Sequence, residues 1–204
     1  MIKTVIFDIG NVLVDFSWWP YICSIYDEET ARVITDAFWK NGYWEEFDRG
    51  VLSYDEIVAL MEKAAPGYER EIHTALENAG GCLHKMDYAI PWIKQLKEMG
   101  YQVVFLSNYS EFLMELNPEV LDFLPYMDGG LFSCHAKLIK PDLAIYQRLC
   151  EKCGLIPEES LFIDDNAANI EAAKRFGLHA IRFEGYEKSY DAIMRFLTCN
   201  VERK

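Results

Sequence analysis

The sequence lacks long hydrophobic runs. No apolar stretch among its 204 residues approaches the roughly 20 that a bilayer-spanning helix needs. The first residues also lack the basic flank and apolar centre of a secretory signal. Hydrophobic residues make up 51% of the chain and aromatic residues 14%. A substantial buried core can therefore still form. We therefore expect a soluble, cytoplasmic protein that has no membrane partner.

Positive charge is scarce and is not clustered. The chain has 20 Lys and Arg against 33 Asp and Glu, for a net charge of −13. Binding to nucleic acid depends on groups of basic side chains that displace counterions from phosphates. We therefore expect no nucleic-acid partner. A small phosphorylated ligand would need a locally positive site, made by a lysine, a helix N-terminus or a metal ion. The sequence does not indicate an oligomeric state.

The six cysteines do not follow the spacing of a secreted disulfide scaffold. Cys150 and Cys153 form a C-x-x-C pair, but this pair lies inside a predicted helix over 142–153, at apolar spacing. A redox dithiol is expected at a strand-to-helix turn, and a zinc site would need a second pair of ligands. We expect reduced cysteines that serve in packing.

Two continuous apolar runs, "IKTVIF" and "YQVVFLS", are typical of strands buried on both faces of a parallel sheet. After the second run, predicted helices from 110, over 142–153, over 167–176 and from 187 alternate with the strands "GLFSC", "SLFIDD" and "HAIRF". This order predicts βαβ units. We therefore expect an α/β protein whose core is a doubly wound, Rossmann-like parallel sheet.

The segment 16–85 shows helical patterns and no convincing strand. Ser53 and Glu56, for example, have the spacing of a capping box before an apolar helical pattern. We predict a helical-bundle cap of four helices over 16–85, inserted after the first strand, and a core formed by 1–15 and 86–204. The cap is rich in aromatic residues. Most should pack in its interior, while Trp18, Trp19 or Trp44 would suit stacking on a sugar ring.

Polar side chains recur at the ends of the predicted strands and in one neighbouring loop. They are Asp8, Ser107, Asn108, Lys140, Asp164 and Asp165. The carboxyl ends of parallel strands meet at one crevice, where ligands bind. Acids gathered there raise one another's pKa unless a cation compensates, and oxygen ligands with a phosphate favour Mg²⁺. An ionised Asp8 could then attack phosphorus in line, with Lys140, Mg²⁺ and Ser107 stabilising the charge.

Four motifs in order, "FDIGNV", "VVFLSN", "LIKPD" and "LFIDDNAANI", resemble those of the haloacid dehalogenase-like hydrolases, and over essentially the whole chain the pattern is similar to the capped phosphatases of that family. It looks closest to the subgroup of bacterial sugar phosphatases that act on α-glucose 1-phosphate. The resemblance implies a Mg²⁺ cofactor and a role for each matching residue. The implied catalytic residues are Asp8 as nucleophile, Lys140 and Ser107; the implied metal ligands are Asp8, Gly10 through its carbonyl, and Asp165, supported by Asp164 and Asn169; the phosphate or substrate ligands are Ser107, Asn108, Asn11 and Arg49.

The sequence departs from the family pattern at Gly10. The family has a second aspartate there, which protonates the leaving alcohol and then activates water. Glycine retains the carbonyl but has no acid, and losing a general acid–base group typically costs about 10²–10⁴-fold in rate. Asn11, which can only hydrogen-bond, and Asp15 are the candidates to replace it by position.

Substrate specificity is expected to lie in the cap. The stretch "WEEFDRGVLS" places Glu46, Asp48 and Arg49 before a glycine, on a predicted loop that faces the crevice. Arg49 either binds a sugar hydroxyl or a distal phosphate, or pairs with a neighbouring acid on the surface. The sequence leaves both roles open.

We expect a Mg²⁺-dependent phosphomonoesterase that acts on a small phosphorylated metabolite, foremost a sugar phosphate, through an aspartyl-phosphate. A metal-independent dehalogenase is the first alternative, although the intact pair Asp164 and Asp165 would then have no cation to bind. A second alternative is a catalytically weak protein that binds a phosphorylated ligand, because Gly10 replaces the usual acid.

Overall fold

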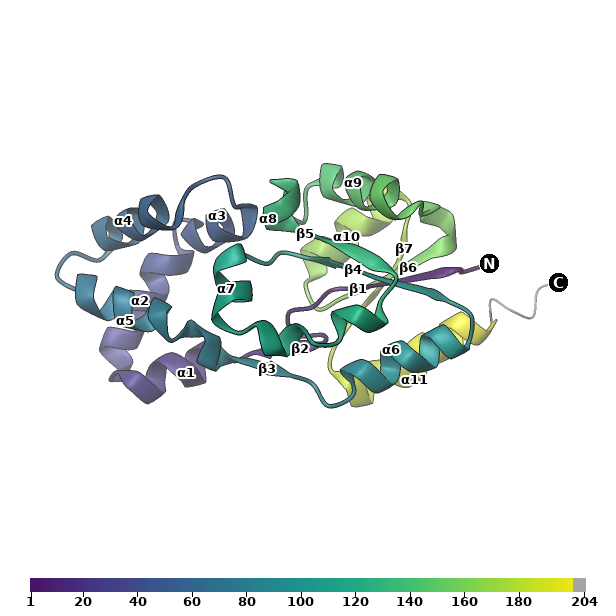
Figure 1. The fold of residues 1–204 in the computed structure, drawn as a ribbon, viewed down its shortest axis with the longest axis horizontal. Helices are drawn as coiled ribbons and strands as arrows, with labels where there is room; N and C mark the ends of the chain where they lie inside the picture. The colour runs from purple at the N-terminus through teal and green to yellow at the C-terminus, as the bar shows by residue number, and fades with distance from the viewer. Residues whose placement is uncertain (200–204) are drawn as a thin grey trace.

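The computed structural model describes residues 1–199, and a parallel β-sheet lies at its centre (Figure 1). The sheet has the strand order β5-β4-β1-β6-β7. Its strands are β1 (Thr4–Phe7), β4 (Gln102–Ser107), β5 (Gly129–Phe132), β6 (Ser160–Asp164) and β7 (His179–Arg182). All four neighbouring pairs run parallel. The predicted doubly wound α/β core is therefore confirmed.

Helices cover both faces of the sheet. α6 (Ala89–Glu98) and α11 (Tyr186–Cys199) lie together on one face, and α9 (Leu143–Cys153) and α10 (Ala167–Phe176) on the other (Figure 1). Successive side chains along a strand point to opposite faces, so β1 contributes side chains to the cores on both faces of the sheet. Val5 and Phe7 pack in the α6 and α11 core, whereas Ile6 packs in the α9 and α10 core. None of the helices among residues 1–199 combines the length and the apolar character needed to cross a membrane.

The register of the sheet brings the strand ends level with one another. Phe7, the last residue of β1, pairs with Phe105 on β4 and with Ile163 on β6. The residues that follow these positions, including Asp8 and Asp164, therefore emerge at the same edge of the sheet. This is the edge where open parallel sheets bind their ligands.

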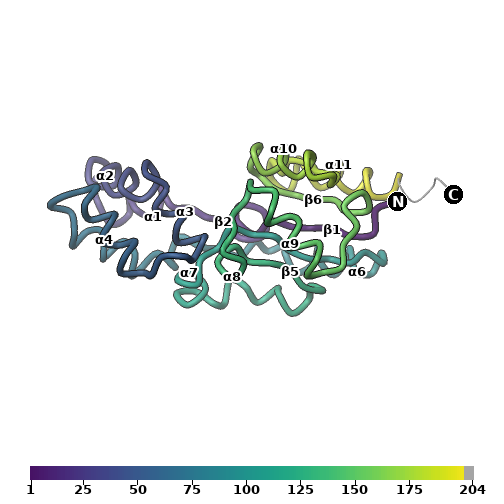
Figure 2. The backbone as a smooth tube through the Cα atoms, turned by 90° about the horizontal axis from the view of Figure 1, so that it is seen from above, coloured from purple at the N-terminus to yellow at the C-terminus, as the bar shows by residue number. Residues whose placement is uncertain are grey.

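Five helices form a separate layer beyond this edge, and we call them the cap. They are α1 (Trp18–Ile25), α2 (Glu28–Trp39), α3 (Tyr43–Arg49), α4 (Tyr54–Ala64) and α5 (Glu69–Glu77), and a short 3₁₀ turn, η1 (Ala79–Cys82), follows them. The prediction of four helices was therefore wrong. Figure 2 shows the cap at one end of the molecule and the start of the chain at the other. The predicted domain boundaries near residues 15 and 86 stay a prediction.

Two short strands connect the cap to the sheet layer. β2 (Val14–Phe16) and β3 (Leu83–Lys85) pair antiparallel, with Asp15 opposite His84. The sequence analysis expected no strand over 16–85, and it missed these because three residues are too few to show an alternating pattern. Both chain passages between the layers thus run through one hydrogen-bonded ribbon.

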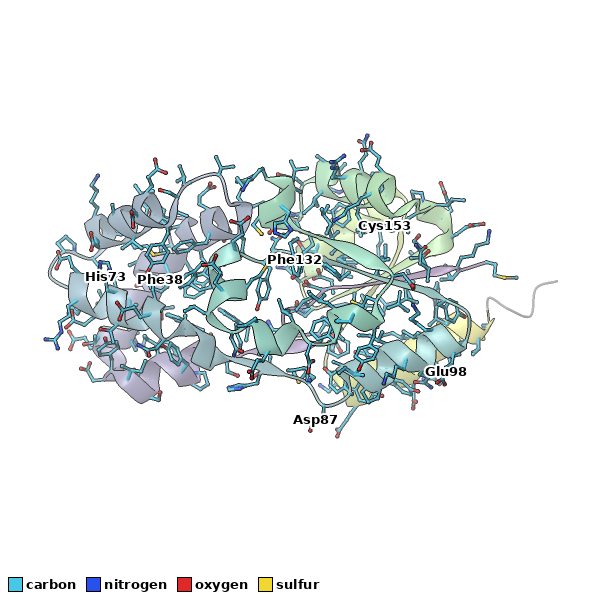
Figure 3. The ribbon with its side chains drawn as sticks, in the orientation of Figure 1. Phe38, His73, Asp87, Glu98, Phe132 and Cys153 are labelled. Atoms are coloured by element: carbon cyan, nitrogen blue, oxygen red, sulfur yellow. The ribbon has the colours of Figure 1, made fainter. Side chains whose placement is uncertain are left out.

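Helix α4 of the cap begins where the sequence predicts. The hydroxyl of Ser53 accepts a hydrogen bond from the backbone N–H of Glu56, and the Glu56 carboxylate accepts one from the Ser53 N–H at 2.8 Å. This capping box satisfies two N–H groups that the first turn of α4 leaves free. Inside the cap, Phe38 is fully buried among aromatic side chains that include Trp18 and Trp44 (Figure 3).

The remaining elements are small: α7 (Glu111–Leu116) and α8 (Ser133–Ala136), with the 3₁₀ turns η2 (Pro118–Leu121), η3 (Leu124–Tyr126) and η4 (Pro157–Glu159). All six cysteines are free. Cys150 and Cys153 lie on α9 and pack against its core, as the helical spacing predicts (Figure 3).

Candidate active site

Asp8 directly follows β1 and is almost fully buried, with 7% of its surface exposed. Its Oδ1 accepts a hydrogen bond from the Ile9 N–H at 2.7 Å and lies 2.8 Å from the Nζ of Lys140. Burial raises the pKa of Asp8 well above its ordinary value; Lys140 opposes this shift, and the charge of Asp164 adds to it. A carboxylate in this setting depends on nearby positive charge to remain ionised.

Lys140 supplies one such charge. Its ammonium group also lies 2.7 Å from Oδ2 of Asp164, so it bridges two buried carboxylates. Burial opposes the charged form of Lys140, but Asp164 and Asp8 outweigh it and raise its pKa above the ordinary value. The loop that carries Lys140 is fixed by Asn108, whose side chain donates to the Lys140 carbonyl at 3.0 Å and accepts from the Lys140 N–H at 2.8 Å. The cation therefore has a fixed position beside Asp8.

Asp164 ends β6 and is fully buried. Besides Lys140, it accepts hydrogen bonds from the Asn166 N–H at 2.7 Å and from the Asn169 side chain at 3.0 and 3.1 Å. These donors occupy both of its oxygens. Asp164 thus holds Lys140 and the loop in place. The supporting role of Asp164 and Asn169 at a metal site stays a prediction.

Asp165 is less enclosed and has fewer partners. Burial raises its pKa, and the charge of Asp164 adds to the shift. One oxygen accepts a hydrogen bond from the Asn11 side chain at 3.2 Å. Carboxylate oxygens of Asp8, Asp164 and Asp165 all lie within 4.8 Å of one another. This all-oxygen group fits Mg²⁺. Because Asp164 is occupied by protein donors, Asp8 and Asp165 are the carboxylates available to bind a cation directly.

A cavity of about 290 Å³ opens above these groups. Both layers of the molecule contribute to its wall. The core supplies Asp8, Gly10, Asn11, Asn108, Tyr109, Leu113, Lys140, Asp165, Asn166 and Asn169; the cap supplies Trp39, Trp44 and Asp48; the connecting strands supply Val14, Phe16 and Leu83. The site is therefore completed by the cap rather than by the sheet alone.

Two predicted ligands do not line this cavity in the described part of the chain. Ser107 is fully buried, and its hydroxyl donates only a long hydrogen bond, 3.4 Å, to the Asn108 carbonyl. Arg49 pairs with Glu46 at 3.2 Å and approaches Asp142 to 4.0 Å. The ion pair with a neighbouring acid, one of its two predicted roles, is thus present. Binding of phosphate or substrate by Ser107 and Arg49 stays a prediction.

Several wall residues lie outside the predicted set of site residues, among them Tyr109, Trp39 and Asp48. Tyr109 lies two residues beyond the end of β4, and Trp39 ends α2 and stacks on Trp44 with ring centroids 4.8 Å apart. Asp48 was expected on a loop facing the crevice; it faces the cavity but belongs to helix α3. Asp15, a candidate replacement acid, accepts a hydrogen bond from the Ser17 hydroxyl and is not part of the wall.

Comparison with known proteins places this geometry in a family. The model of the haloacid dehalogenase-like hydrolases matches residues 2–177. The chain belongs to this family. Asp8, Lys140, Asp164 and Asp165, which belong to the motifs of the sequence resemblance, thus lie together in a haloacid dehalogenase-like hydrolase.

Three relatives of this hydrolase illustrate the range of the family. A D-ribitol-5-phosphate phosphatase from Bacteroides thetaiotaomicron is 27% identical over 193 residues, covering 90% of this chain and 93% of the relative. An (S)-2-haloacid dehalogenase from Burkholderia cepacia is 31% identical over 90 residues, covering 44% and 39%. A HAD family enzyme from B. thetaiotaomicron, solved with magnesium and inorganic phosphate, shares the fold with a TM-score of 0.68 and 21% identity, covering 89% and 94%.

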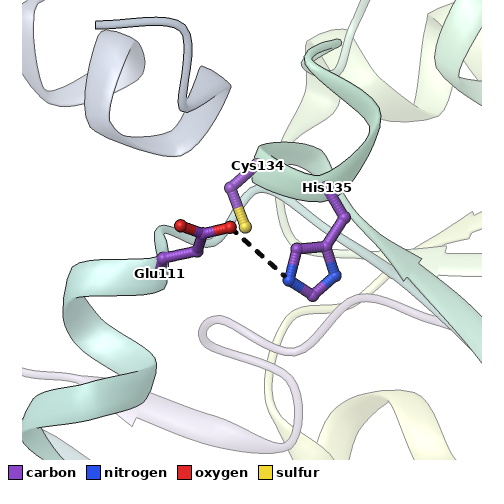
Figure 4. Close-up of side chains that lie close together, drawn as sticks. All are labelled: Glu111, Cys134 and His135. Carbon is purple, nitrogen blue, oxygen red and sulfur yellow. Dashed lines mark ion pairs between the residues drawn. The ribbon is translucent and has the colours of Figure 1, made fainter. Parts of the chain in front are cut away.

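A second group of side chains that could hold a metal ion lies outside the cavity. Glu111, Cys134 and His135 gather where α7 meets α8, with the Glu111 carboxylate 3.9 Å from the His135 imidazole (Figure 4). Burial raises the pKa of the Cys134 thiol to about 11, and Glu111 adds to the shift. The thiolate is the form that binds metals, so this thiol is a weak ligand at neutral pH. The carboxylates around Asp8 are the better fit for a hard cation.

Proposed function

We propose that this hydrolase is a Mg²⁺-dependent phosphatase of small phosphorylated metabolites, foremost sugar or polyol phosphates. One observation carries the proposal. The Asp8 carboxylate, in the cavity wall with Asp165, contacts the buried ammonium of Lys140, and carboxylate oxygens of Asp8, Asp164 and Asp165 lie within 4.8 Å of one another. A nucleophile, a fixed cation and an oxygen-rich metal site are the parts that transfer of a phosphoryl group requires.

The chemistry follows from the positions of these groups. Asp8 attacks phosphorus, the bond to the leaving alcohol breaks, and an aspartyl-phosphate forms; water then attacks phosphorus and frees Asp8. Lys140 balances the charge of Asp8 and of the incoming phosphoryl group. When bound to Asp8 and Asp165, Mg²⁺ would neutralise phosphoryl oxygens and orient them for in-line attack. Asn169 and Asp164 keep Lys140 in place throughout.

The cavity supports a small substrate. Its volume of about 290 Å³ lies at the low end for ligand pockets. Trp39 and Trp44 offer aromatic faces, which suit the apolar face of a sugar or polyol. The net charge of −13 disfavours large polyanions. The D-ribitol-5-phosphate phosphatase among the relatives acts, by its name, on a phosphorylated polyol. α-Glucose 1-phosphate remains the first candidate from the sequence resemblance.

Two other functions are separable from this one. A dehalogenase would use Asp8 to attack carbon without a metal, and haloacid dehalogenases are among the relatives, but the acids Asp8, Asp164 and Asp165 lie close enough together to hold a cation. A protein that binds phosphorylated ligands without turnover is favoured by one observation, the glycine at position 10.

The test is release of inorganic phosphate from a panel of sugar and polyol monophosphates, with Mg²⁺ or with EDTA. We expect turnover of at least one member that requires Mg²⁺ and that falls on the order of 10⁴-fold or more in Asp8→Asn. Halide release from 2-haloacids in EDTA would support the dehalogenase instead. Binding of Mg²⁺ and BeF₃⁻ at Asp8 without turnover of any phosphate ester would support the binding protein.

A further inference from the structure

The space beside Gly10, where the family has its acid–base aspartate, is open in this chain. A Cβ atom built on Gly10 meets no atom within 4 Å. The two candidates from the sequence are engaged elsewhere, because the Asn11 side chain donates to Asp165 and the Asp15 carboxylate accepts from Ser17. A phosphatase of unactivated alcohols still needs a proton donor for the leaving oxygen. The donor must therefore come from another part of the cavity wall.

Asp48 is the remaining carboxyl group of the wall that lies outside the acidic group around Asp8. It enters from the cap and lines the cavity together with Asp8, Gly10 and Lys140. Only 8% of its surface is exposed. Because Asp48 lines the cavity, its carboxyl group could hydrogen-bond to a substrate oxygen there.

The core fixes the position of Asp48 even though the residue belongs to α3. The Ser133 hydroxyl donates to the Asp48 backbone carbonyl at 2.5 Å and accepts from the Tyr109 N–H at 2.9 Å. The next residue, Arg49, approaches Asp142 through its guanidinium. The Gly50 carbonyl, two residues after Asp48, accepts a hydrogen bond from the Lys137 ammonium. The end of α3 is thus attached to the loops that surround the nucleophile.

The surroundings of Asp48 favour its protonated form. Burial raises its pKa to about 8, Glu45 on the same helix adds to the shift, and Lys140 opposes it. The other titratable groups that interact with it are Tyr109 and Cys134, and burial raises the pKa of both, so they are neutral near pH 7. A carboxyl group of this kind carries a proton at neutral pH and can give it to a developing alkoxide.

We propose that Asp48 is the general acid and base of this enzyme, supplied by the cap in place of the aspartate that position 10 lacks. The inference rests on the proposed phosphatase function. In the first step Asp8 bonds to phosphorus, the bond between phosphorus and the leaving oxygen breaks, and the Asp48 proton passes to that oxygen. In the second step the Asp48 carboxylate takes a proton from water as the water attacks phosphorus. The bond to Asp8 then breaks, and phosphate leaves.

Two substrates with different leaving groups can show which of the two steps is slowed in the variant Asp48→Asn. With a sugar or polyol phosphate, whose alkoxide needs a proton, we expect turnover to fall about 10²–10⁴-fold. With p-nitrophenyl phosphate, whose phenolate leaves as a stable anion, the first step should survive while the second is slowed. Rapid mixing should therefore show a burst of nitrophenolate equal to the enzyme concentration, and phosphate should accumulate on Asp8. Asp55→Asn, on an exposed part of the cap outside the cavity, is the matched control and should show neither effect.

A rescue keeps the proposal testable if Asp48→Asn perturbs the fold. Gly10→Asp restores the family's acid in space that is open. We expect the double variant Gly10→Asp with Asp48→Asn to recover at least 10-fold of the lost rate, an order-of-magnitude expectation for a restored general acid. Equal loss on both substrates, no burst and no rescue would overturn the role of Asp48 while leaving the phosphatase intact. Absence of Asp8-dependent turnover in the wild type would overturn both proposals.

Discussion

The ammonium of Lys140 lies 2.8 Å from Oδ1 of Asp8 and 2.7 Å from Oδ2 of Asp164, with all three side chains withdrawn from solvent. Two buried carboxylates therefore share a single cation. Removing one partner of a buried ion pair leaves an uncompensated charge, which is far more costly than the pair itself is favourable.

Lys140→Met should accordingly destabilise the protein and inactivate it. We expect the free energy of unfolding in EDTA to fall by about 3–5 kcal/mol, measured by urea denaturation. We expect phosphate release to fall at least about 10²-fold. Lys3→Met is the control, because the Lys3 pair with Glu159 is exposed and should be worth about 0–1 kcal/mol. Similar losses in the two variants would contradict the account of the buried triad.

The stability of the protein should fall as the pH rises between about pH 4 and pH 8. Asp48 keeps its proton in the folded state up to a pKa of about 8 but loses it near about 3.9 in the unfolded chain. Between these values the folded state binds more protons, so the free energy of unfolding decreases with increasing pH. Asp48→Asn removes this contribution. Thermal unfolding of both proteins across the window should show the wild type losing stability relative to the variant at high pH; parallel curves would refute the shift.

Mg²⁺ should stabilise the folded protein through Asp165. A ligand at 100 times its dissociation constant adds about 2.7 kcal/mol when it binds only the folded state. We expect Mg²⁺ to raise the melting temperature of the wild type, EDTA to reverse the rise, and Asp165→Asn to reduce it strongly. Asp191→Asn, an exposed acid on α11, should keep the full response. A response that survives in Asp165→Asn would place the ion elsewhere, for example at Glu111 and His135.

Substitution by alanine should destabilise the protein at Gly130 but not at Gly10. A Cβ on Gly130 in β5 would lie 2.2 Å from the Phe105 ring, and its φ of 152° is strained for other residues. Gly130→Ala should therefore lower the free energy of unfolding by about 1–3 kcal/mol or more. Gly10→Ala, where the space is open, should leave stability nearly unchanged. Differential scanning calorimetry of the two variants measures this difference. Equal melting temperatures for Gly130→Ala and Gly10→Ala would contradict the prediction.

The sequence was sufficient for the part of the site that the sheet carries. Asp8, Lys140, Asp164 and Asn169 lie at strand ends or in the adjacent loops and helix starts of a regular βα order, and the register of parallel strands brings such positions together. This reasoning failed at Ser107, where the residue that reaches the cavity is the next one in the chain. It ends β4 and is fully buried, whereas Asn108, the next residue, reaches the cavity.

The contribution of the cap could not be derived in the same way. Amphipathic spacing shows which face of a helix is buried, but not whether that face meets the cap interior or the cavity. Trp18 and Trp44 have similar sequence signals, yet only Trp44 reaches the cavity. The sequence places Asp48 on a predicted loop facing the crevice, but not on helix α3, whose end is held by a hydrogen bond from Ser133, more than 80 residues away in the chain.

The Ser133 hydrogen bond to the Asp48 carbonyl joins the two layers, as do the Lys137 bond to the Gly50 carbonyl and the β2 and β3 ribbon. The nucleophile stays with the sheet, and the proton donor travels with the helices. Any movement that admits substrate by parting the layers would also separate acid from nucleophile, so the ester could be cleaved only after the layers have met again. Water that entered an open site would find Asp8 without its partner, and the phosphorylated aspartate would persist until the next closure.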